Sequence, residues 1–462
     1  MSPVISYALE SVTYNIPARV LRTHFGTFYH QPSRRYLRQY LMHANAPPYL
    51  TYQWQEGVES LESYRSGGYH PTHIGDQYRD SRYEVVHKLG YGSYSTVWLA
   101  KDHLENTHVS LKILVSSVSQ KSSECRILRQ LASGKQNHQG RVHVPSLLEE
   151  FVIDGPNGSH LCIVSEAAGC SVAQSKEASM TWKFPASVAK SISAQVLLGL
   201  DYVHSCGVVH SDLHCNNILF LNPALETCST KQLYYRLGEP QKLPVKRLDK
   251  TPNGPGVPEY CVPPAMIFQS SEEIVDARII ISDFGEAFLQ DETRNELHTP
   301  IMLLPPEVFF GEHLGMPIDM WTLGCTLYEI LGERPLFEGF MPDQDHVIAE
   351  MISTLGQLPK RWWDRWQRKS DFFLENGSWK IDTHRSHAPY YRPLTERLRI
   401  MGRGEQQSTC EFGVDEMACL QKLLTSMLTY EPSERITSSA AVTSEWMERW
   451  GKPAMEQTRV RP

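Results

Sequence analysis

The side chains best suited to chemistry lie in two short stretches. Within 208–220, a polar loop between two apolar runs carries Asp212 and, five residues later, Asn217. Within 279–285, three isoleucines and a serine lead to Asp283, which is followed by Phe and Gly. A carboxylate can accept the proton of a hydroxyl group, and amide and carboxylate oxygens are suitable ligands for Mg²⁺. The spacing therefore indicates phosphoryl transfer, with Asp212 as proton acceptor and Asn217 and Asp283 as metal ligands.

A glycine-rich turn and a lysine upstream fit the same chemistry. Gly90 and Gly92 lie between two runs of β-forming residues, and glycines let backbone amides approach phosphates closely. A second strand follows the turn, whereas a dinucleotide-binding fold needs a helix there, so that fold is excluded. Lys112 lies in the next predicted strand and Glu124 in the helix after it, so the two side chains are expected to pair and to present the ammonium group to nucleotide phosphates. Each feature alone often marks only a turn or a solvated lysine, but the ordered set is specific.

These side chains require a small set of elements to position them. β-Forming residues flanking the glycines predict a hairpin over 83–100, and a further strand is expected over 108–114. Apolar spacing predicts helices over 123–131 and 186–204. The apolar run 279–281 predicts a buried strand.

Composition excludes several classes of protein. The 462 residues include 45 Lys and Arg against 52 Asp and Glu, a net charge of −7, which argues against a protein that coats nucleic acid. With 41% hydrophobic and 21% charged residues, the chain is not disordered throughout. No apolar run reaches the roughly 18 residues that a membrane-spanning helix needs. The ten cysteines form no CxxC pair, which argues against a zinc ribbon and suits a reducing compartment.

The ordered motifs resemble the eukaryotic protein kinase family from about Tyr83 to Trp450. Pro305-Pro306-Glu307 is similar to the family's Ala-Pro-Glu, Asp319 begins a segment similar to its Asp-x-Trp-x-x-Gly helix, and Arg435 stands where the family's arginine pairs with that glutamate. The resemblance implies an α+β, two-lobed protein kinase fold, with a small antiparallel β lobe carrying one helix and a large, mainly helical lobe. It also implies ATP and Mg²⁺ as cofactors and Ser or Thr of a protein as the acceptor.

A narrower resemblance is to the SR-protein kinases, particularly their fungal relatives. It rests on residues 67–71, 74–76, 88–92 and 95–99, and on Thr299-Pro300 followed by 304–308. It implies serine in Arg-Ser repeats of SR-type splicing factors as substrate, and an insertion before Asp-Phe-Gly. We therefore expect a monomer in cytoplasm and nucleus that acts on protein substrates and binds neither nucleic acid directly nor membrane.

The family resemblance assigns a role to each site residue. The expected catalytic residues are Asp212, Lys112, Glu124 and His214. The expected nucleotide-binding residues are Leu89, Gly90, Gly92, Ser93, Ser95, Val97, Ser110, Lys112, Ser165, Glu166 and Ala168. The expected metal ligands are Asn217 and Asp283, and the expected structural residues are Glu307, Asp319 and Arg435.

Departures from the family pattern keep two alternatives open. Ser95 replaces the third glycine, and His214 replaces a lysine that contacts the γ-phosphate in typical members. These departures favour a pseudokinase scaffold or, through His-x-Asp without that lysine, a small-molecule phosphotransferase. Ser211 replaces the arginine that clamps a phosphorylated activation loop, so loop phosphorylation should not be needed and Thr299 is expected to be structural. Ser165 occupies the gatekeeper position, where a small side chain would leave space beside the adenine.

The predicted organisation has four parts. They are an Arg-bearing extension over 1–55, a connector over 56–82, a kinase domain over 83–449 and a tail over 450–462. Within the domain, the small lobe is expected over 83–168, the large lobe over 169–449 and the insertion over 222–278. The first 55 residues contain five Arg, no Lys and a single acid, which is typical of either a flexible extension or a mitochondrial transit segment.

Overall fold

The computed structural model describes residues 50–458 apart from 268, 340–341, 381–390 and 405–409. Residues 51 onward form one compact unit. The prediction of a flexible or transit extension over 1–55 therefore falls almost wholly outside the described residues. No helix in the described part of the chain combines the length and apolar character needed to cross a membrane.

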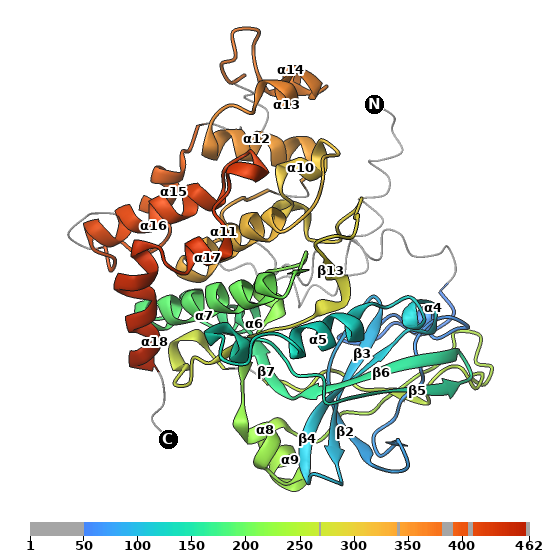
Figure 1. Cartoon of the computed structure of the whole chain (residues 1–462). Coiled ribbons are helices and arrows are strands. Elements are labelled where there is room, and N and C mark those ends of the chain that lie inside the picture. The colour runs from blue at the N-terminus through green and yellow to red at the C-terminus, as the bar shows by residue number, and fades with distance from the viewer. Residues whose placement is uncertain (1–49, 268, 340–341, 381–390, 405–409, 459–462) are drawn as a thin grey trace. The chain divides into compact units, whose positions relative to one another are not determined.

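The N-terminal lobe is an antiparallel sheet with the strand order β1-β2-β3-β4-β6-β5. Its strands are β1 (Gln77–Tyr78), β2 (Tyr83–Gly92), β3 (Ser95–Asp102), β4 (Thr107–Leu114), β5 (Glu149–Gly155) and β6 (Gly158–Glu166). One face of the sheet buries Trp98, Leu111 and Val164 in a core of their own. Two helices accompany the sheet, α4 (Ser116–Ser119) and α5 (Glu124–Ala132), and Figure 1 shows α5 beside β3 and β6.

The C-terminal lobe is built around two long, almost fully buried helices, α7 (Ala186–Ser205) and α11 (Pro317–Leu331). The surrounding helices are α6 (Val172–Glu177), α10 (Pro306–Phe309), α12 (Gln344–Leu355), α13 (Lys360–Arg365), α14 (Lys369–Phe372), α15 (Leu394–Arg399), α16 (Val414–Met427), α17 (Ser438–Ala441) and α18 (Lys452–Thr458). Two small sheets join β12 (Ile279–Ile281), β9 (Ile218–Leu221) and β7 (Ala168–Ser171), and β13 (Phe288–Leu289) with β8 (Val208–Val209). This arrangement confirms the predicted two-lobed α+β fold (Figure 1).

The boundaries of the folded unit extend beyond the predicted domain at both ends. Residues 51–69 contribute Tyr52, Val58, Leu61 and others to a small apolar core shared with the insertion. At the other end a helical turn over Met447–Gly451 continues into α18, which packs on α7. The Thr458 hydroxyl donates to Ser191 Oγ at 2.6 Å and so fixes the end of α18 to α7.

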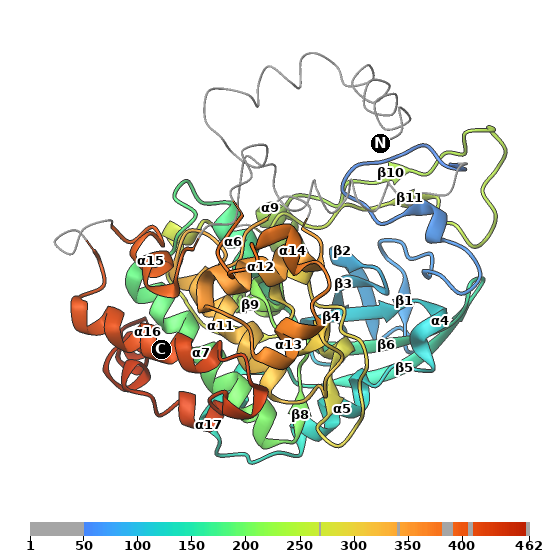
Figure 2. The ribbon, with the colours of Figure 1, turned by 90° about the horizontal axis from the view of Figure 1, so that it is seen from above.

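The insertion packs on the sheet at two places. Its helices α8 (Pro223–Thr227) and α9 (Thr230–Leu237) bury Leu225 and Leu233 against residues of the sheet. Further along, β10 (Leu243–Pro244) pairs with β11 (Tyr260–Cys261), and Figure 2 shows this pair beyond β2, close to residues 51–69. The insertion therefore starts and ends in the helical lobe but has much of its apolar contact with the N-terminal lobe.

Candidate active site

Strand register places several predicted nucleotide-binding residues on one face of the sheet. Val97 lies opposite Lys112, and Ser110 lies opposite Ser165. Residues directly opposite in a sheet share a face, as do residues two apart in one strand. All four side chains therefore lie on the same face. Gly90 lies opposite Val97, and Gly92 lies opposite Ser95 at the end of β2.

Lys112 is held by two carboxylates from different elements. Its Nζ lies 2.8 Å from both carboxylate oxygens of Glu124 on α5 and 2.8 Å from Asp283 Oδ1. Burial acts to lower the pKa of Lys112, but the carboxylates of Asp283 and Glu124 raise it well above its usual value. The Lys112 ammonium in turn lowers the pKa of Asp283 to about 2. Lys112 is therefore charged at neutral pH, as a contact for phosphate oxygens requires.

Asn217 and Asp283 reach the same end of a strand pair. β9 and β12 are antiparallel with Ile218 opposite Ile281, so Asn217 just precedes one strand and Asp283 follows closely after the other. The backbone N–H of Ser282 donates to the Asn217 carbonyl at 2.7 Å and closes this end. Asp283 has a φ of 63°, a left-handed conformation, and its carboxylate is about half exposed.

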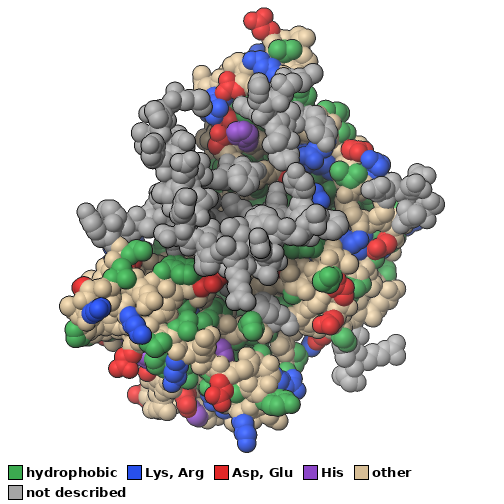
Figure 3. Space-filling view, turned by 180° about the vertical axis from the view of Figure 1, so that it is seen from behind, with side chains coloured by type: hydrophobic (Ala, Val, Ile, Leu, Met, Phe, Trp, Pro, Cys, Tyr) green, Lys and Arg blue, Asp and Glu red, His purple; other side chains and the backbone are tan. Residues whose placement is uncertain are grey.

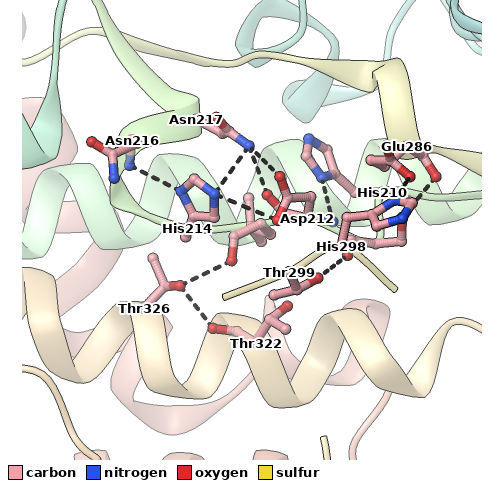
Figure 4. A network of polar contacts seen from close by, with 12 residues as sticks. His210, Asp212, His214, Asn216, Asn217, Glu286, His298, Thr299, Thr322 and Thr326 are labelled. Carbon is pink, nitrogen blue, oxygen red and sulfur yellow. Dashed lines mark hydrogen bonds and ion pairs between the residues drawn. The ribbon is translucent and has the colours of Figure 1, made fainter. Parts of the chain in front are cut away.

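The catalytic loop brings Asp212, His214 and Asn217 into one hydrogen-bonded group (Figure 4). Asn217 Nδ2 donates to the Asp212 carbonyl at 2.8 Å and to Asp212 Oδ2 at 3.2 Å. His214 Nε2 lies 3.4 Å from Asp212 Oδ1, and its Nδ1 accepts from the backbone N–H of Asn216 at 3.2 Å. The Asp212 carboxylate is thus held in place while remaining about one-fifth exposed.

Oxygen ligands in this arrangement fit Mg²⁺. The hydrogen bonds of Asn217 to Asp212 use its amide nitrogen, which leaves the amide oxygen for a metal. Asp283 offers a carboxylate whose depressed pKa keeps it ionised. Hard oxygen donors of this kind, supplemented by phosphate oxygens and water, are what Mg²⁺ prefers.

The loop is supported from below by Asp319 at the start of α11. Asp319 Oδ2 and Oδ1 accept the backbone N–H groups of His210 and Ser211, both at 2.8 Å, and Oδ2 also contacts His204 Nε2 at 2.9 Å. This carboxylate is fully buried. Deeper in the lobe, Arg435 forms a two-pronged ion pair with Glu307, both N–O distances being 2.6 Å.

The activation segment is attached to the catalytic loop by neutral hydrogen bonds. The Ser211 hydroxyl donates to the Glu286 carbonyl at 2.8 Å, and the buried Thr299 hydroxyl donates to the Ser211 carbonyl (Figure 4). Ser211 itself has a φ of 64°. No arginine of the catalytic loop takes part in these two contacts. That this attachment needs no phosphate stays a prediction.

The chain crosses between the lobes at Glu166 to Ala168. Glu166 ends β6 opposite Val109, and Ala168 pairs with Leu221 of β9. The Glu166 carboxylate accepts the backbone N–H of Ser146 at 2.9 Å, which ties this side chain to the segment before β5. Of the other predicted residues, Ser93 is exposed in the glycine-rich turn, while Ser95 and Leu89 are largely covered.

Three sets of contacts that the motifs did not predict hold the nucleotide-binding face from outside. The Tyr69 hydroxyl donates to the Gly92 carbonyl at 2.7 Å. Lys88 forms a buried ion pair with Glu59. Leu89 and the crossing residue Ala167 pack with insertion helices α8 and α9. Of the segments involved, residues 67–71 contributed to the resemblance to SR-protein kinases. That resemblance did not predict the contact of Tyr69 with Gly92.

Comparison with known proteins agrees with this geometry. The family described as Protein kinase domain matches residues 83–228 and 265–447. Protein kinase dsk1 of Schizosaccharomyces pombe is 26% identical, with 86% of each chain covered. Serine/threonine-protein kinase SRPK of Physarum polycephalum is 28% identical over 84% of this chain and 91% of its own. SRSF protein kinase 3 of Homo sapiens is 37% identical over 36% of this chain and 30% of its own.

Proposed function

Because the chain belongs to the protein kinase family and is a serine/threonine protein kinase of the SR-protein kinase type, we propose that it transfers the γ-phosphate of ATP to serine in arginine-rich protein segments, with Mg²⁺ bound at Asn217 and Asp283. The observation that carries the proposal is the assembled Lys112–Glu124 pair beside Asp283. A scaffold without activity has no need for a lysine held by two carboxylates next to a metal-binding pair. The small-molecule phosphotransferase alternative is set aside, because the relatives are protein kinases.

Each residue then has one task in the transfer. Lys112 holds the α- and β-phosphates, and the amides of the turn from Gly90 to Ser95 cover them. Bound Mg²⁺ neutralises the phosphate charge. Asp212 orients the serine hydroxyl and accepts its proton as the bond from serine Oγ to the γ-phosphorus forms. The bond from that phosphorus to the β-phosphate oxygen breaks, and ADP leaves.

The arginine preference rests on the similarity to kinases named SRPK and SRSF protein kinase 3. Asp343 and Asp345, two acids near the start of α12, both lie within 3.3 Å of Arg368 and are thus paired within the protein. On the face shown in Figure 3, acidic and basic side chains are interspersed. A substrate arginine would therefore have to compete with Arg368 for these acids, which makes the peptide preference a separate question from kinase activity.

One assay separates the two parts of the proposal. The purified full chain is incubated with labelled ATP and Mg²⁺, with an Arg-Ser repeat peptide, a matched Lys-Ser repeat peptide and a generic basic protein. We expect label on serine, strongly reduced but still measurable in Asp212→Asn, with faster transfer to the Arg-Ser peptide than to the Lys-Ser peptide. Transfer at equal rates would remove the arginine preference, whereas ATP binding without transfer to any substrate would restore the pseudokinase alternative.

We also propose that the kinase acts as a monomer in cytoplasm and nucleus, where SR-type substrates would be met. Localising a fluorescent fusion of the full chain tests the location, because the composition of residues 1–55 also fits a mitochondrial transit segment. Co-localisation with a mitochondrial marker would overturn the proposal.

A further inference from the structure

The catalytic loop carries an imidazole whose tautomer is fixed by its neighbours. His214 Nδ1 accepts the backbone N–H of Asn216 at 3.2 Å. A backbone N–H can only donate, so Nδ1 must present its lone pair. The ring of a neutral histidine then carries its proton on Nε2. Nε2 lies 3.4 Å from Asp212 Oδ1, and the His214 side chain is only 9% exposed.

The oxygen that faces Nε2 lacks a hydrogen-bond donor. Asp212 Oδ1 is buried and receives no hydrogen bond with good geometry from the described residues. The other oxygen, Oδ2, already accepts a hydrogen bond from Asn217 Nδ2 at 3.2 Å. Asn217 Nδ2 also lies 3.4 Å from His214 Nε2, but its second proton is directed to the Asp212 carbonyl at 2.8 Å. The Nε2 proton therefore has the Asp212 carboxylate as its available acceptor.

We propose that His214 is a positioning residue for the transfer: its Nε2–H donates to Asp212 Oδ1 and, with Asn217 on Oδ2, fixes the carboxylate plane toward the substrate hydroxyl. This inference rests on the proposed kinase activity. A separation of 3.4 Å is longer than a formed hydrogen bond, and catalytic contacts of this kind shorten when substrate binds. The substrate proton goes to a remaining lone pair of Asp212, and the proton on Nε2 stays in place. His214 thus acts through Asp212, unlike the lysine of typical kinases, which contacts the γ-phosphate.

A pair of substitutions separates the two ring nitrogens. In His214→Asn the side-chain oxygen can still accept the Asn216 N–H, but no donor reaches Asp212. In His214→Gln the longer amide can place an N–H near the position of Nε2. Hydrogen bonds to charged groups contribute enough that we expect kcat to fall about 10- to 100-fold in His214→Asn. The glutamine variant should retain about tenfold more kcat than the asparagine variant, with the KM for ATP within about twofold of wild type in both.

The comparison with Asp212→Asn shows whether His214 acts through Asp212. In the Asp212→Asn background, His214→Asn should cause no further loss of kcat beyond about twofold, because coupled residues are not additive. A full further loss would overturn the proposal, as would a rise in the KM for ATP with kcat unchanged, which is the pattern of a γ-phosphate contact.

Nitrogen NMR of ¹⁵N-histidine-labelled full-length protein tests the tautomer without any activity. The His214 signal, identified by its absence in His214→Asn, should show an unprotonated Nδ1 and a protonated Nε2. A protonated Nδ1 would overturn the proposal. If the wild type transfers phosphate to no substrate, the kinase proposal fails, and the NMR measurement still tests the tautomer of His214 independently.

Discussion

The buried ion pair between Lys88 and Glu59 provides a quantitative test of whether the residues before the sheet belong to the folded kinase. The Lys88 side chain is fully buried and that of Glu59 is 1% exposed. The Tyr64 hydroxyl donates to the same Glu59 carboxylate, and the Lys88 ammonium lies 5.1 Å from the centre of the Trp98 ring. Lys88 is two residues before Gly90, so the pair links residues 51–69 directly to the glycine-rich turn.

Neutralising only Glu59 should lower the free energy of unfolding more than replacing both Glu59 and Lys88 by apolar residues. In Glu59→Gln the ammonium of Lys88 stays buried without its counter-ion, and removing one partner of such a pair costs about 3–5 kcal/mol. Replacing both side chains by apolar ones of similar size, Glu59→Leu with Lys88→Met, removes the cost of the unpaired charge. It leaves the buried Tyr64 hydroxyl without its acceptor, which costs about 1–3 kcal/mol. The double variant should therefore be more stable than either single one. The matched control is Asp364→Asn in the exposed pair with Lys360, which should cost about 0–1 kcal/mol.

The free energy of unfolding is measured by urea titration with tryptophan fluorescence, and the KM for ATP on the same samples. Glu59→Gln should lose stability by the stated amount and show a raised KM for ATP, and the double variant should recover part of the lost stability and a KM for ATP closer to wild type. A loss below about 1 kcal/mol in Glu59→Gln, no larger than that of the exposed pair, would refute the reasoning. So would a double variant less stable than both single ones, because the cost would then come from packing and not from the unpaired charge.

Three further predictions concern the site. Tyr69→Phe removes the donor to the Gly92 carbonyl and should raise the KM for ATP about 2- to 10-fold by steady-state kinetics with kcat unchanged, and a fall in kcat alone would contradict this. Thr299→Val leaves the buried Ser211 carbonyl without its donor, so kcat should fall about 5- to 100-fold. Phosphatase treatment of the wild type should leave its kinase activity intact. Loss of activity on that treatment would show that the activation segment needs a phosphate. Ser165→Phe should raise the inhibition constant of purine inhibitors with bulky substituents, because Ser165 lies on the same face of the sheet as Lys112. Equal inhibition of the wild type and the variant would count against a pocket beside Ser165.

Local sequence pattern predicted the elements that carry the chemistry. The hairpin around Gly90 and Gly92, the strand with Lys112 and the helix with Glu124 are confirmed within one or two residues. The helix expected over 186–204 is found as Ala186–Ser205. These features follow from propensity and spacing along the chain, which a single sequence contains.

The supporting contacts could not be predicted in the same way. Glu59 lies 29 residues before Lys88, in the stretch 56–82 that was predicted to be a connector, and only tertiary burial makes it a partner of Lys88. The same applies to Leu233 of the insertion, which packs near Leu89 and Ala167 although nothing in its local sequence indicates a partner. Pairing over such separations is decided by packing, which spacing does not encode.

The departures from the kinase pattern become consistent with one another in the structure. Ser211 and His214 each stand where typical members have a cation, so the catalytic loop lacks two positive charges. In their place the loop is held by neutral donors: the Ser211 and Thr299 hydroxyls fix it to the activation segment, and His214 Nε2 faces Asp212. We expect a loop held in this way to need no phosphate to complete it. Positive charge at the phosphates must then come from the metal and from Lys112, which two carboxylates hold in place.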